Sequence, residues 1–249
     1  MALRKFRIFR GDSRETGELV EFEVECGEGM VVLDAVHRIQ AEQAPDLACR
    51  WNCKAGKCGS CGADVNGKPK LMCMTRLSDY PEDEVITITP MRAFPVIRDL
   101  ATDVSINYEN NRRLPHFQPR PADFEDGEFR MYQWEVERPQ EFRKCIECFL
   151  CQNVCHVLRT HDKHQEFIGP AFFVRTAVYE MHPADVGDRR EHLKEHGGIG
   201  LCNITKCCTE VCPEKIKITD NAIIPLKERV ADKYYDPLRW LLRKLTGRG

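Results

Sequence analysis

Fourteen cysteines, most of them in regular groups, constrain this chain more than any other feature of its sequence. The three groups are Cys53, Cys58, Cys61 and Cys73; Cys145, Cys148, Cys151 and Cys155; and Cys202, Cys208 and Cys212. The chain has no apolar run near the roughly 18 residues that a spanning helix needs, and its first residues lack the apolar centre of a secretory signal. The chain is therefore expected to stay in the reducing cytosol, where grouped cysteines serve metal binding or catalysis rather than disulfides. We therefore expect metal centres.

The first group has the ligand spacing of plant-type 2Fe–2S proteins, in which three cysteines of one loop, Cys-x4-Cys-x2-Cys, act with a distant fourth. Its members are Cys53, Cys58, Cys61 and Cys73. Gly56, Gly59 and Gly62 allow the backbone to wrap closely and to point N–H groups at sulfur. A four-cysteine zinc site is the alternative, and it needs neither this spacing nor so many glycines. The loop therefore favours a 2Fe–2S cluster.

The second group follows the bacterial ferredoxin pattern, Cys-x2-Cys-x2-Cys-x3-Cys, and the third group repeats that pattern with one cysteine missing. The first, third and fourth cysteines of the second group stand six and then four positions apart along the chain. The same two intervals separate Cys202, Cys208 and Cys212. Thr205 stands where the repeated run would have its own middle cysteine. The two runs are therefore interpreted as copies.

In paired ferredoxin clusters, the fourth cysteine of each run binds the other cluster. This rule gives a 4Fe–4S cluster four ligands, which are Cys145, Cys148, Cys151 and Cys212. The other cluster receives the thiolates of Cys155, Cys202 and Cys208. Because threonine is a poor ligand for such soft sites, three thiolates predict a 3Fe–4S cluster, with a labile fourth iron as the alternative. The remaining cysteines, expected to be packed or free thiols, are Cys26, Cys49 and Cys207.

Hydrophobic patterning predicts a mixed α and β domain before residue 106. Alternation of apolar and polar residues predicts strands at residues 3–10, 18–25 and 84–90. Residues 32–43 carry apolar side chains at helical spacing, and a small sheet covered by one helix fits these elements. The polar, proline-containing stretch at residues 107–126 has the composition of a linker, so we place the domain boundary just before it.

The second domain, residues 106–249, is predicted to be mostly α-helical. Helix-length apolar patterns occur at residues 141–158, 169–182 and 224–245, the second opening with Pro170 near its start. The last part of the third pattern mixes leucines with basic residues. This composition fits a helix that lies on a membrane or a partner, and it equally fits an amphipathic helix packed on the core.

Charge and motif content exclude several classes of function. The 37 Lys and Arg residues face 39 Asp and Glu residues, which leaves no basic excess for nucleic acid, so no nucleic-acid partner is expected. The chain has neither a complete dinucleotide fingerprint nor a P-loop. It can thus pass single electrons but has no visible place for two-electron chemistry on carbon, and that chemistry must lie on a partner.

The order of a plant-type 2Fe–2S group followed by two interleaved ferredoxin runs resembles the iron–sulfur subunit of succinate dehydrogenase (succinate:quinone oxidoreductase) and fumarate reductase. The segments FPVIRDLATDVS, FIGPAF and VCPEKIKI, at residues 94–105, 167–172 and 211–218, are further landmarks of the resemblance. It implies an α+β chain with an N-terminal β-grasp 2Fe–2S domain, residues 1–105, and a bacterial-ferredoxin-like α-helical domain with 4Fe–4S and 3Fe–4S clusters, residues 106–249. The cluster ligands that it implies are those derived above.

The resemblance also implies a place in an enzyme complex. The chain would relay electrons from a flavoprotein subunit with FAD to quinone in membrane anchor subunits, which can also carry haem. It would lie at the cytoplasmic face of the cell membrane, held there by the anchor, and would contribute no catalytic residue of its own. His156, Asn203 and Thr205 are expected on the quinone-facing side.

Three other functions stay open at this point. A fumarate reductase subunit would work in the reverse direction. A stand-alone redox carrier, or the iron–sulfur subunit of another flavin oxidoreductase, would use the same cysteines with different partners. A zinc-stabilised binding module would use them for structure only.

Overall fold

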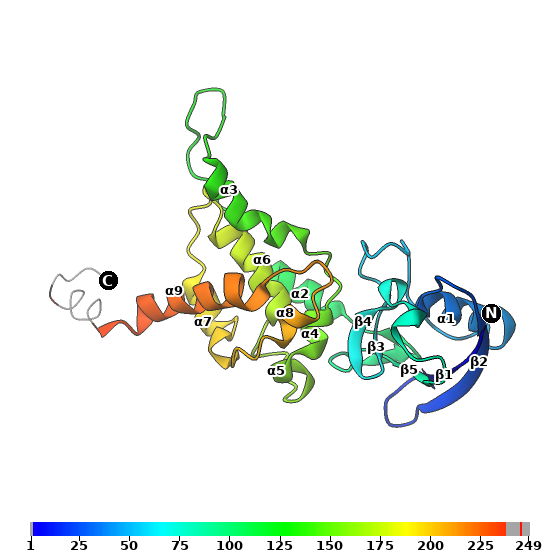
Figure 1. Cartoon of the computed structure of the whole chain (residues 1–249). Helices are drawn as coiled ribbons and strands as arrows, with labels where there is room; N and C mark the ends of the chain where they lie inside the picture. The colour runs from blue at the N-terminus through cyan, green and yellow to red at the C-terminus, as the bar shows by residue number, and fades with distance from the viewer. Residues whose placement is uncertain (1, 238–244, 246–249) are drawn as a thin grey trace.

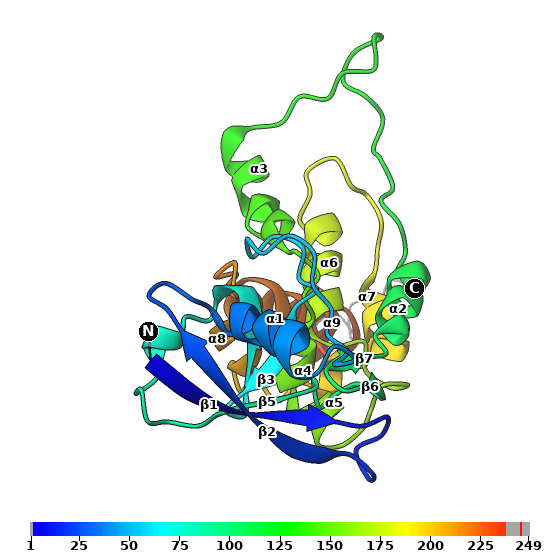
Figure 2. The same cartoon turned by 90° about the vertical axis from the view of Figure 1, so that its right-hand side faces the viewer.

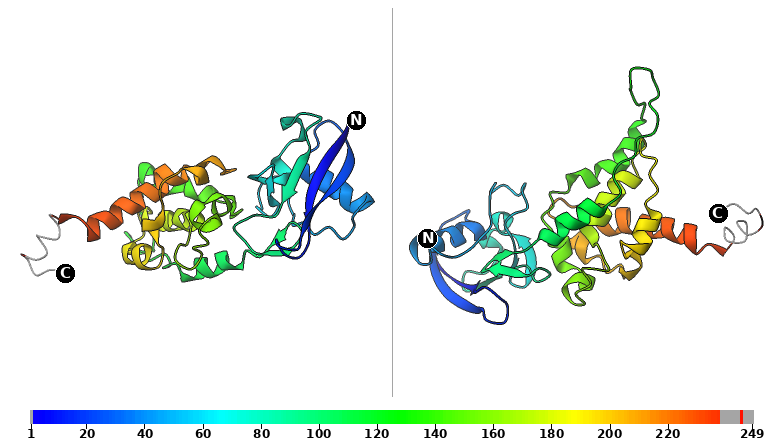
Figure 3. Two further views of the ribbon diagram at one scale, coloured as in Figure 1. Left: turned by 90° about the horizontal axis from the view of Figure 1, so that it is seen from below. Right: turned by 180° about the vertical axis from the view of Figure 1, so that it is seen from behind.

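The computed structural model describes residues 2–237 and 245, which form a sheet domain and a helical domain that lie side by side (Figure 1). The sheet domain occupies one end of the molecule, and helix α9 extends from the opposite end (Figure 3). One continuous set of buried apolar side chains runs through both domains. The expected order, an α+β domain followed by a mostly helical one, is confirmed.

The first domain is a five-stranded mixed sheet with the order β2-β1-β5-β3-β4. Its strands are β1 (Ala2–Arg10), β2 (Glu18–Cys26), β3 (Gly62–Val65), β4 (Lys68–Leu71) and β5 (Ile86–Thr89). Only the central pair, β1 and β5, is parallel, and the other neighbours are antiparallel. Helix α1 (Val32–Glu42) packs on the sheet and buries Val32, Val36 and Ile39 completely. This is the β-grasp arrangement, and the predicted strands at residues 3–10, 18–25 and 84–90 belong to it.

Two strands of the sheet have no counterpart in the sequence prediction. All four residues of β3 are buried, so the strand lacks the alternation of apolar and polar residues that marks a half-exposed strand. Strand β4 is four residues long and contains Pro69. A separate pair of short strands, β6 (Val96–Arg98) and β7 (Ala101–Thr102), leads to the second domain.

The second domain packs short helices around α6 (Figure 2). The helices are α2 (Ser105–Arg113), α3 (Gln133–Gln140), α4 (Leu150–Val154), α5 (His156–Arg159), α6 (Pro170–Glu180), α7 (Arg190–Glu195), α8 (Cys207–Glu210) and α9 (Ile224–Tyr234). A π-helical segment, Ile218–Ile223, runs directly into α9. Helix α6 begins at Pro170 as predicted, because proline needs no N–H partner in the first turn of a helix. Its side chains Phe172 and Phe173 are buried.

The predicted linker at residues 107–126 is wrong for its first third. Helix α2 covers Ser105–Arg113, and two of its asparagines, Asn107 and Asn110, are buried. Gln152 Nε2 of α4 donates a hydrogen bond to Asn107 Oδ1 at 3.2 Å. Polar composition alone predicts a solvated linker here, but these two amides are buried, and Asn107 accepts a hydrogen bond from inside the domain.

The helix pattern at residues 141–158 is also corrected, because the structure divides it. A 3-10 turn ends at Lys144, and α4 starts only at Leu150. Between them Glu147 and Phe149 adopt left-handed backbone angles, with φ of 54° and 58°. A continuous helix cannot contain such residues. The interruption turns the chain around its cysteines.

The predicted helix at residues 224–245 is confirmed from Ile224 to Tyr234 by α9. Its basic, leucine-containing end at residues 239–248 lies outside the described residues, apart from an exposed Leu245. Within residues 2–237 and position 245, no helix combines the length and apolar character needed to cross a membrane.

Candidate metal centres

The first set of cysteines comes from a loop between α1 and β3 and from the turn after β4. The N–H groups of Ala55 and Lys57 point at Cys53 Sγ, 3.4 and 3.3 Å away. The N–H of Cys73, in the 3-10 turn after β4, points at Cys61 Sγ at 3.5 Å. N–H groups aimed at sulfur stabilise the negative charge that thiolate ligands share with iron. The loop thus has the donor arrangement that an iron–sulfur group needs.

The thiols of this set differ in their surroundings. Cys61 and Cys73 are buried, whereas Cys53 is exposed. Burial, with the adjacent Cys73 and Cys58, raises the pKa of Cys61 to about 12. Burial alone would also raise the pKa of Cys58, but hydrogen bonds with Ser60 and Cys53 together outweigh it and lower that pKa to about 6. These mutual effects show that the cysteines lie within electrostatic range of one another.

The two ferredoxin runs have the same backbone conformation. In the first run, the residues two and four positions after Cys145 have left-handed φ angles of 54° and 58°. In the second run, Ile204 and Lys206 stand two and four positions after Cys202, and their φ angles are 60° and 62°. A short helix starts one residue later in each run, at Leu150 and at Cys207. The spacing argument and the backbone therefore agree that the runs are copies.

This structural match assigns equivalent positions to residues of the two runs. Thr205 stands between the two left-handed residues of its run, as Cys148 does in the first. Cys207 is the first helical residue, the position of the buried Leu150. The hydroxyl of Thr205 lies 3.2 Å from Cys207 Sγ. By register, Thr205 is equivalent to Cys148 and Cys207 is equivalent to Leu150.

The structure brings Cys212 to the first run. Burial raises the pKa of Cys145, and the charge of Cys212 adds to that effect. Burial likewise raises the pKa of Cys148 to about 12, with contributions from Cys145 and Cys212. Cys151 is the fourth member of the group. Burial raises the pKa of its thiol, and the charges of Cys148 and Cys145 raise it further.

An apolar cavity lies among these four thiols. Its walls include Cys145, Cys148, Cys151 and Cys212 together with the side chains of Ile146, Val174, Ile216 and Ile218. Apolar surroundings disfavour free thiolates, and bound iron reverses that preference by compensating their charge. The donor set and the cavity together fit a 4Fe–4S cluster.

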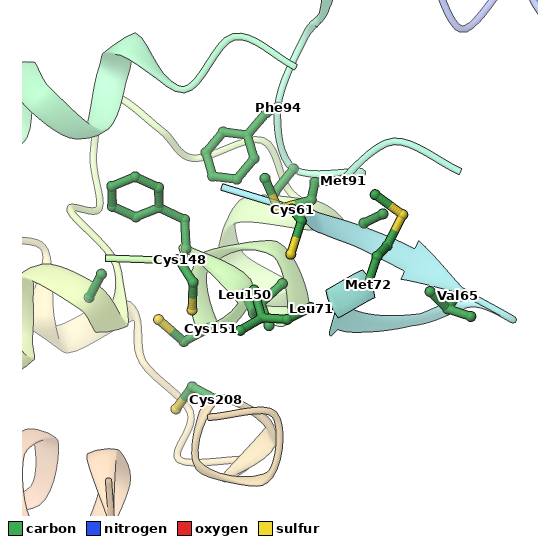
Figure 4. Packing of buried hydrophobic residues seen from close by; sticks show 14 of the residues in the cluster. Cys61, Val65, Leu71, Met72, Met91, Phe94, Cys148, Leu150, Cys151 and Cys208 are labelled. Atoms are coloured by element: carbon green, nitrogen blue, oxygen red, sulfur yellow. The ribbon is translucent and has the colours of Figure 1, made fainter. Parts of the chain in front are cut away.

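The third set consists of Cys155, Cys202 and Cys208. Burial raises the pKa of Cys208 to about 11, and the charges of Cys207, Cys202 and Cys155 contribute to the shift. The buried hydroxyl of Thr219 lies 3.4 Å from Cys208 Sγ. In the view of Figure 4, Cys148 and Cys151 lie between Cys61 on one side and Cys208 on the other. The three sets of cysteines therefore follow one another through the molecule.

The residues expected on the quinone side lie around this third set. His156 is half-buried and opens α5 directly after Cys155. Asn203 and Thr205 are exposed, as are the neighbouring apolar side chains of Leu201 and Ile204. Of the remaining cysteines, Cys26 is buried in the sheet domain, and Cys49 and Cys207 are half-buried. In the part of the chain that the structure describes, no three His, Cys, Asp or Glu side chains converge tightly enough to hold a single metal ion.

Two family models match the chain, one in each domain. A 2Fe-2S iron-sulfur cluster binding domain matches residues 5–109, and a 4Fe-4S dicluster domain matches residues 141–216. A chain of the Mycobacterium smegmatis Sdh1 complex in the apo form is 61% identical with a TM-score of 0.91, and the match covers 95% of this chain and 98% of that one.

Curated relatives are similar over most of their length. The fumarate reductase iron-sulfur subunit of Mycobacterium tuberculosis (strain CDC 1551 / Oshkosh) is 35% identical over 78% of this chain and 79% of that protein. The protein of the same name from Wolinella succinogenes is 30% identical over 90% of this chain and 93% of its own length. This chain belongs to the succinate dehydrogenase and fumarate reductase iron–sulfur subunits.

Membership of this subunit family confirms several expectations from the sequence. The 2Fe–2S and 4Fe–4S chemistry expected from the cysteine spacing matches the two domain models, and the family carries a 3Fe–4S cluster in addition. The alternative of a zinc-stabilised binding module is wrong. Like its relatives, this iron–sulfur subunit is a component of an oxidoreductase complex.

Sequence analysis of this iron–sulfur subunit missed the residues that join the two domains at the metal centres. Gly59 touches Cys148, and Asn153 of α4 is hydrogen-bonded to Asp64 of β3. The sequence indicates for Gly59 only that the loop can wrap closely there, and it gives no indication of a role for Asn153. Their contacts connect distant parts of the chain, which no local pattern reports.

Proposed function

We propose that the chain is the electron-transfer subunit of a membrane-bound succinate:quinone oxidoreductase that works in the direction of succinate oxidation. The observation that carries the direction is the 61% identity, over 98% of its length, to a chain of an Sdh1 complex. The similarity to fumarate reductase subunits is lower, at 30 to 35%. Reduction of fumarate is the second candidate, favoured by the names of those relatives.

The proposed partners follow from this assignment. A flavoprotein subunit with FAD would supply electrons, and membrane anchor subunits, which can carry haem, would hold the quinone. The chain would be bound peripherally at the cytoplasmic face of the membrane. The exposed residues around the third set of cysteines, Leu201, Asn203, Ile204 and Thr205, would face the anchor, with His156 nearby. The exposed loop at Cys53 would face the flavoprotein.

The internal repeat supports this orientation. Cys148 in the first run is covered by the loop of the sheet domain at Gly59. Thr205, its equivalent in the second run, is exposed. The surface around Cys148 is covered by another redox domain of the same chain. The equivalent surface around Thr205 is uncovered, and we infer that a further redox partner binds there.

Purification of the complex through a tag on this chain tests the proposal. We expect a flavoprotein and a hydrophobic anchor to co-purify, and the complex to reduce quinone with succinate faster than it reduces fumarate with quinol. A chain that purifies alone would support a stand-alone carrier. A complex that mainly reduces fumarate would reverse the proposed direction.

We also propose the ligands of the three clusters. Cys53, Cys58, Cys61 and Cys73 would hold 2Fe–2S; Cys145, Cys148, Cys151 and Cys212 would hold 4Fe–4S; and Cys155, Cys202 and Cys208 would hold 3Fe–4S. Each cluster, when bound, accepts and releases one electron at a time. The polypeptide's own contribution is to aim N–H groups at sulfur, to exclude water with apolar walls and to fix the order of the three sets.

Replacing Cys212 tests the exchange of cysteines between the two runs. Cys212→Ser is expected to abolish the 4Fe–4S signal in electron paramagnetic resonance (EPR) spectra of the reduced complex, because the cluster loses one of its four thiolates. Cys207→Ser is the matched control from the start of α8, five positions before Cys212, and it should retain all three clusters because position 207 corresponds to Leu150. Loss of the 3Fe–4S signal alone in Cys212→Ser would contradict the assignment.

Thr205→Cys tests the identity of the third cluster. The new thiol would stand where Cys148 stands in the first run, and it would supply the fourth thiolate. We expect the EPR signal of the oxidised 3Fe–4S cluster to disappear and a further 4Fe–4S signal to appear after reduction. Thr205→Ser, which keeps a hydroxyl, is the control and should retain the 3Fe–4S signal. An unchanged spectrum of Thr205→Cys, with all iron present, would refute the register of the two runs.

A further inference from the structure

The loop that carries Cys58 and Cys61 lies directly against the backbone of Cys148. Gly59 makes this contact. A Cβ atom added to Gly59 would lie 2.6 Å from Cys148 Cα and 2.9 Å from both its Cβ and its N. Carbon atoms do not approach one another so closely without bonding, so any other residue at position 59 would push the two segments apart.

The contact becomes looser one residue beyond the loop. A Cβ added to Gly62, the first residue of β3, would lie 3.2 Å from Leu150 Cδ2 and 3.6 Å from Cys148 O. Figure 4 shows Cys61, Leu150 and Cys148 close together at this junction. The absence of a side chain at Gly59 therefore sets the closest approach of the two domains.

Hydrogen bonds from Asn153 prevent the two domains from sliding at this contact. Asn153 Nδ2 donates to Asp64 Oδ1 at 2.8 Å, and the N–H of Ala93 donates to Asn153 Oδ1 at 3.0 Å. Arg92 Nε donates to Asp64 Oδ2 at 3.0 Å. Asn153 is 0% and Asp64 1% exposed, so breaking these bonds would leave buried polar groups without partners. Asn153 stands between Cys151 and Cys155, so these hydrogen bonds hold the segment that carries the proposed ligands.

We propose that Gly59 is a positioning residue that sets the separation between the 2Fe–2S and 4Fe–4S donor sets. This inference rests on the ligand sets proposed above. Gly59 is covalently joined to Cys58 and packs directly against Cys148, so it connects a member of one set to a member of the other. The separation of two redox groups controls how fast they exchange electrons and how strongly their unpaired spins interact.

Gly59→Ala in the purified complex tests the proposal, with Gly56→Ala as the matched control. Both residues lie in the same cysteine loop and have left-handed φ angles, 70° and 65°, so both variants carry a similar backbone strain. The three atoms nearest to a Cβ at position 56 all belong to the flexible side chain of Met74. The readout is the enhanced spin relaxation of the reduced 2Fe–2S cluster that a reduced 4Fe–4S cluster causes. We expect Gly59→Ala to lose much of this enhancement and Gly56→Ala to keep it.

An unchanged relaxation enhancement in Gly59→Ala, with both clusters present, would overturn the proposal. If Gly59→Ala loses the 2Fe–2S cluster, Gly62→Val decides, because Gly62 lies outside the loop and a valine side chain would extend beyond the 3.2 to 3.6 Å contacts with Leu150 and Cys148 that a Cβ alone already makes. A reduced enhancement in Gly62→Val supports the proposal, and an unchanged one overturns it. A wild-type complex that shows no 2Fe–2S signal would instead refute the ligand assignment, and this inference with it.

Discussion

Arg189→Met is expected to lower the free energy of unfolding by about 3 to 5 kcal/mol, because it leaves the buried carboxylate of Asp185 without its cation, whereas Glu180 keeps its ion pair with Arg229. Arg189 is 1% exposed and lies 2.8 Å from Asp185 and 3.7 Å from Glu180, both of which are themselves buried. Its guanidinium also donates hydrogen bonds to the carbonyls of Pro115 and His116, which hold the start of the segment after α2. Thermal unfolding followed by circular dichroism should show a midpoint lower by about 10 °C.

The neighbouring Arg190 provides the control for this prediction. It pairs with Asp188 at 2.8 Å, but both side chains are more than one third exposed. Arg190→Met should therefore cost less than about 1 kcal/mol. Adding Asp185→Asn to Arg189→Met should restore part of the stability, because it removes one unpaired buried charge. Equal losses in the two arginine variants would show that burial is not the source of the effect.

Elements with a regular pattern were predictable from the sequence, because burial on one face imposes a period. Strands β1 and β2 alternate, helix α1 buries residues at helical spacing, and α6 opens with a proline. Strand β3 was not predictable, since it is buried on both faces and has no period to detect. The break before α4 was not predictable, because the two residues with left-handed backbone angles there, Glu147 and Phe149, are not glycines.

The metal centres were predictable for a different reason. Cluster ligands must stand at fixed intervals along a turn, so the spacing of Cys202, Cys208 and Cys212 also predicts the backbone conformation between them. The left-handed residues Ile204 and Lys206 recur at the positions that this spacing predicts. The approach of Gly59 to Cys148 depends on how two domains pack, and the bond between Asn153 and Asp64 joins residues 89 positions apart. Such contacts require the structure.

Removal of the iron is expected to unfold the ligand-bearing parts of the second domain while the sheet domain stays folded. Helices α4, α5 and α8 have five, four and four residues, far below the roughly 12 that an isolated helix needs to be stable. The left-handed residues beside them, Ile204 and Lys206 among them, each add about 1 kcal/mol of strain. Metal–thiolate bonds offset these costs, as they do in small metal-dependent domains.

Hydrogen exchange measured by mass spectrometry, before and after anaerobic chelation of the iron in the purified complex, checks this prediction. Peptides from residues 145–159 and 202–212 should lose most of their protection. Peptides from β1 and α1 should keep theirs, because Phe6, Ile8 and Ile39 are fully buried and lie on elements that carry none of the proposed ligands. If the cysteine-bearing segments stayed protected without iron, the prediction would be wrong: apolar packing alone would hold these segments folded, and the clusters would bind to a site that is already formed. If the sheet domain lost its protection as well, the contacts of Gly59 and Asn153 would couple the folding of the two domains.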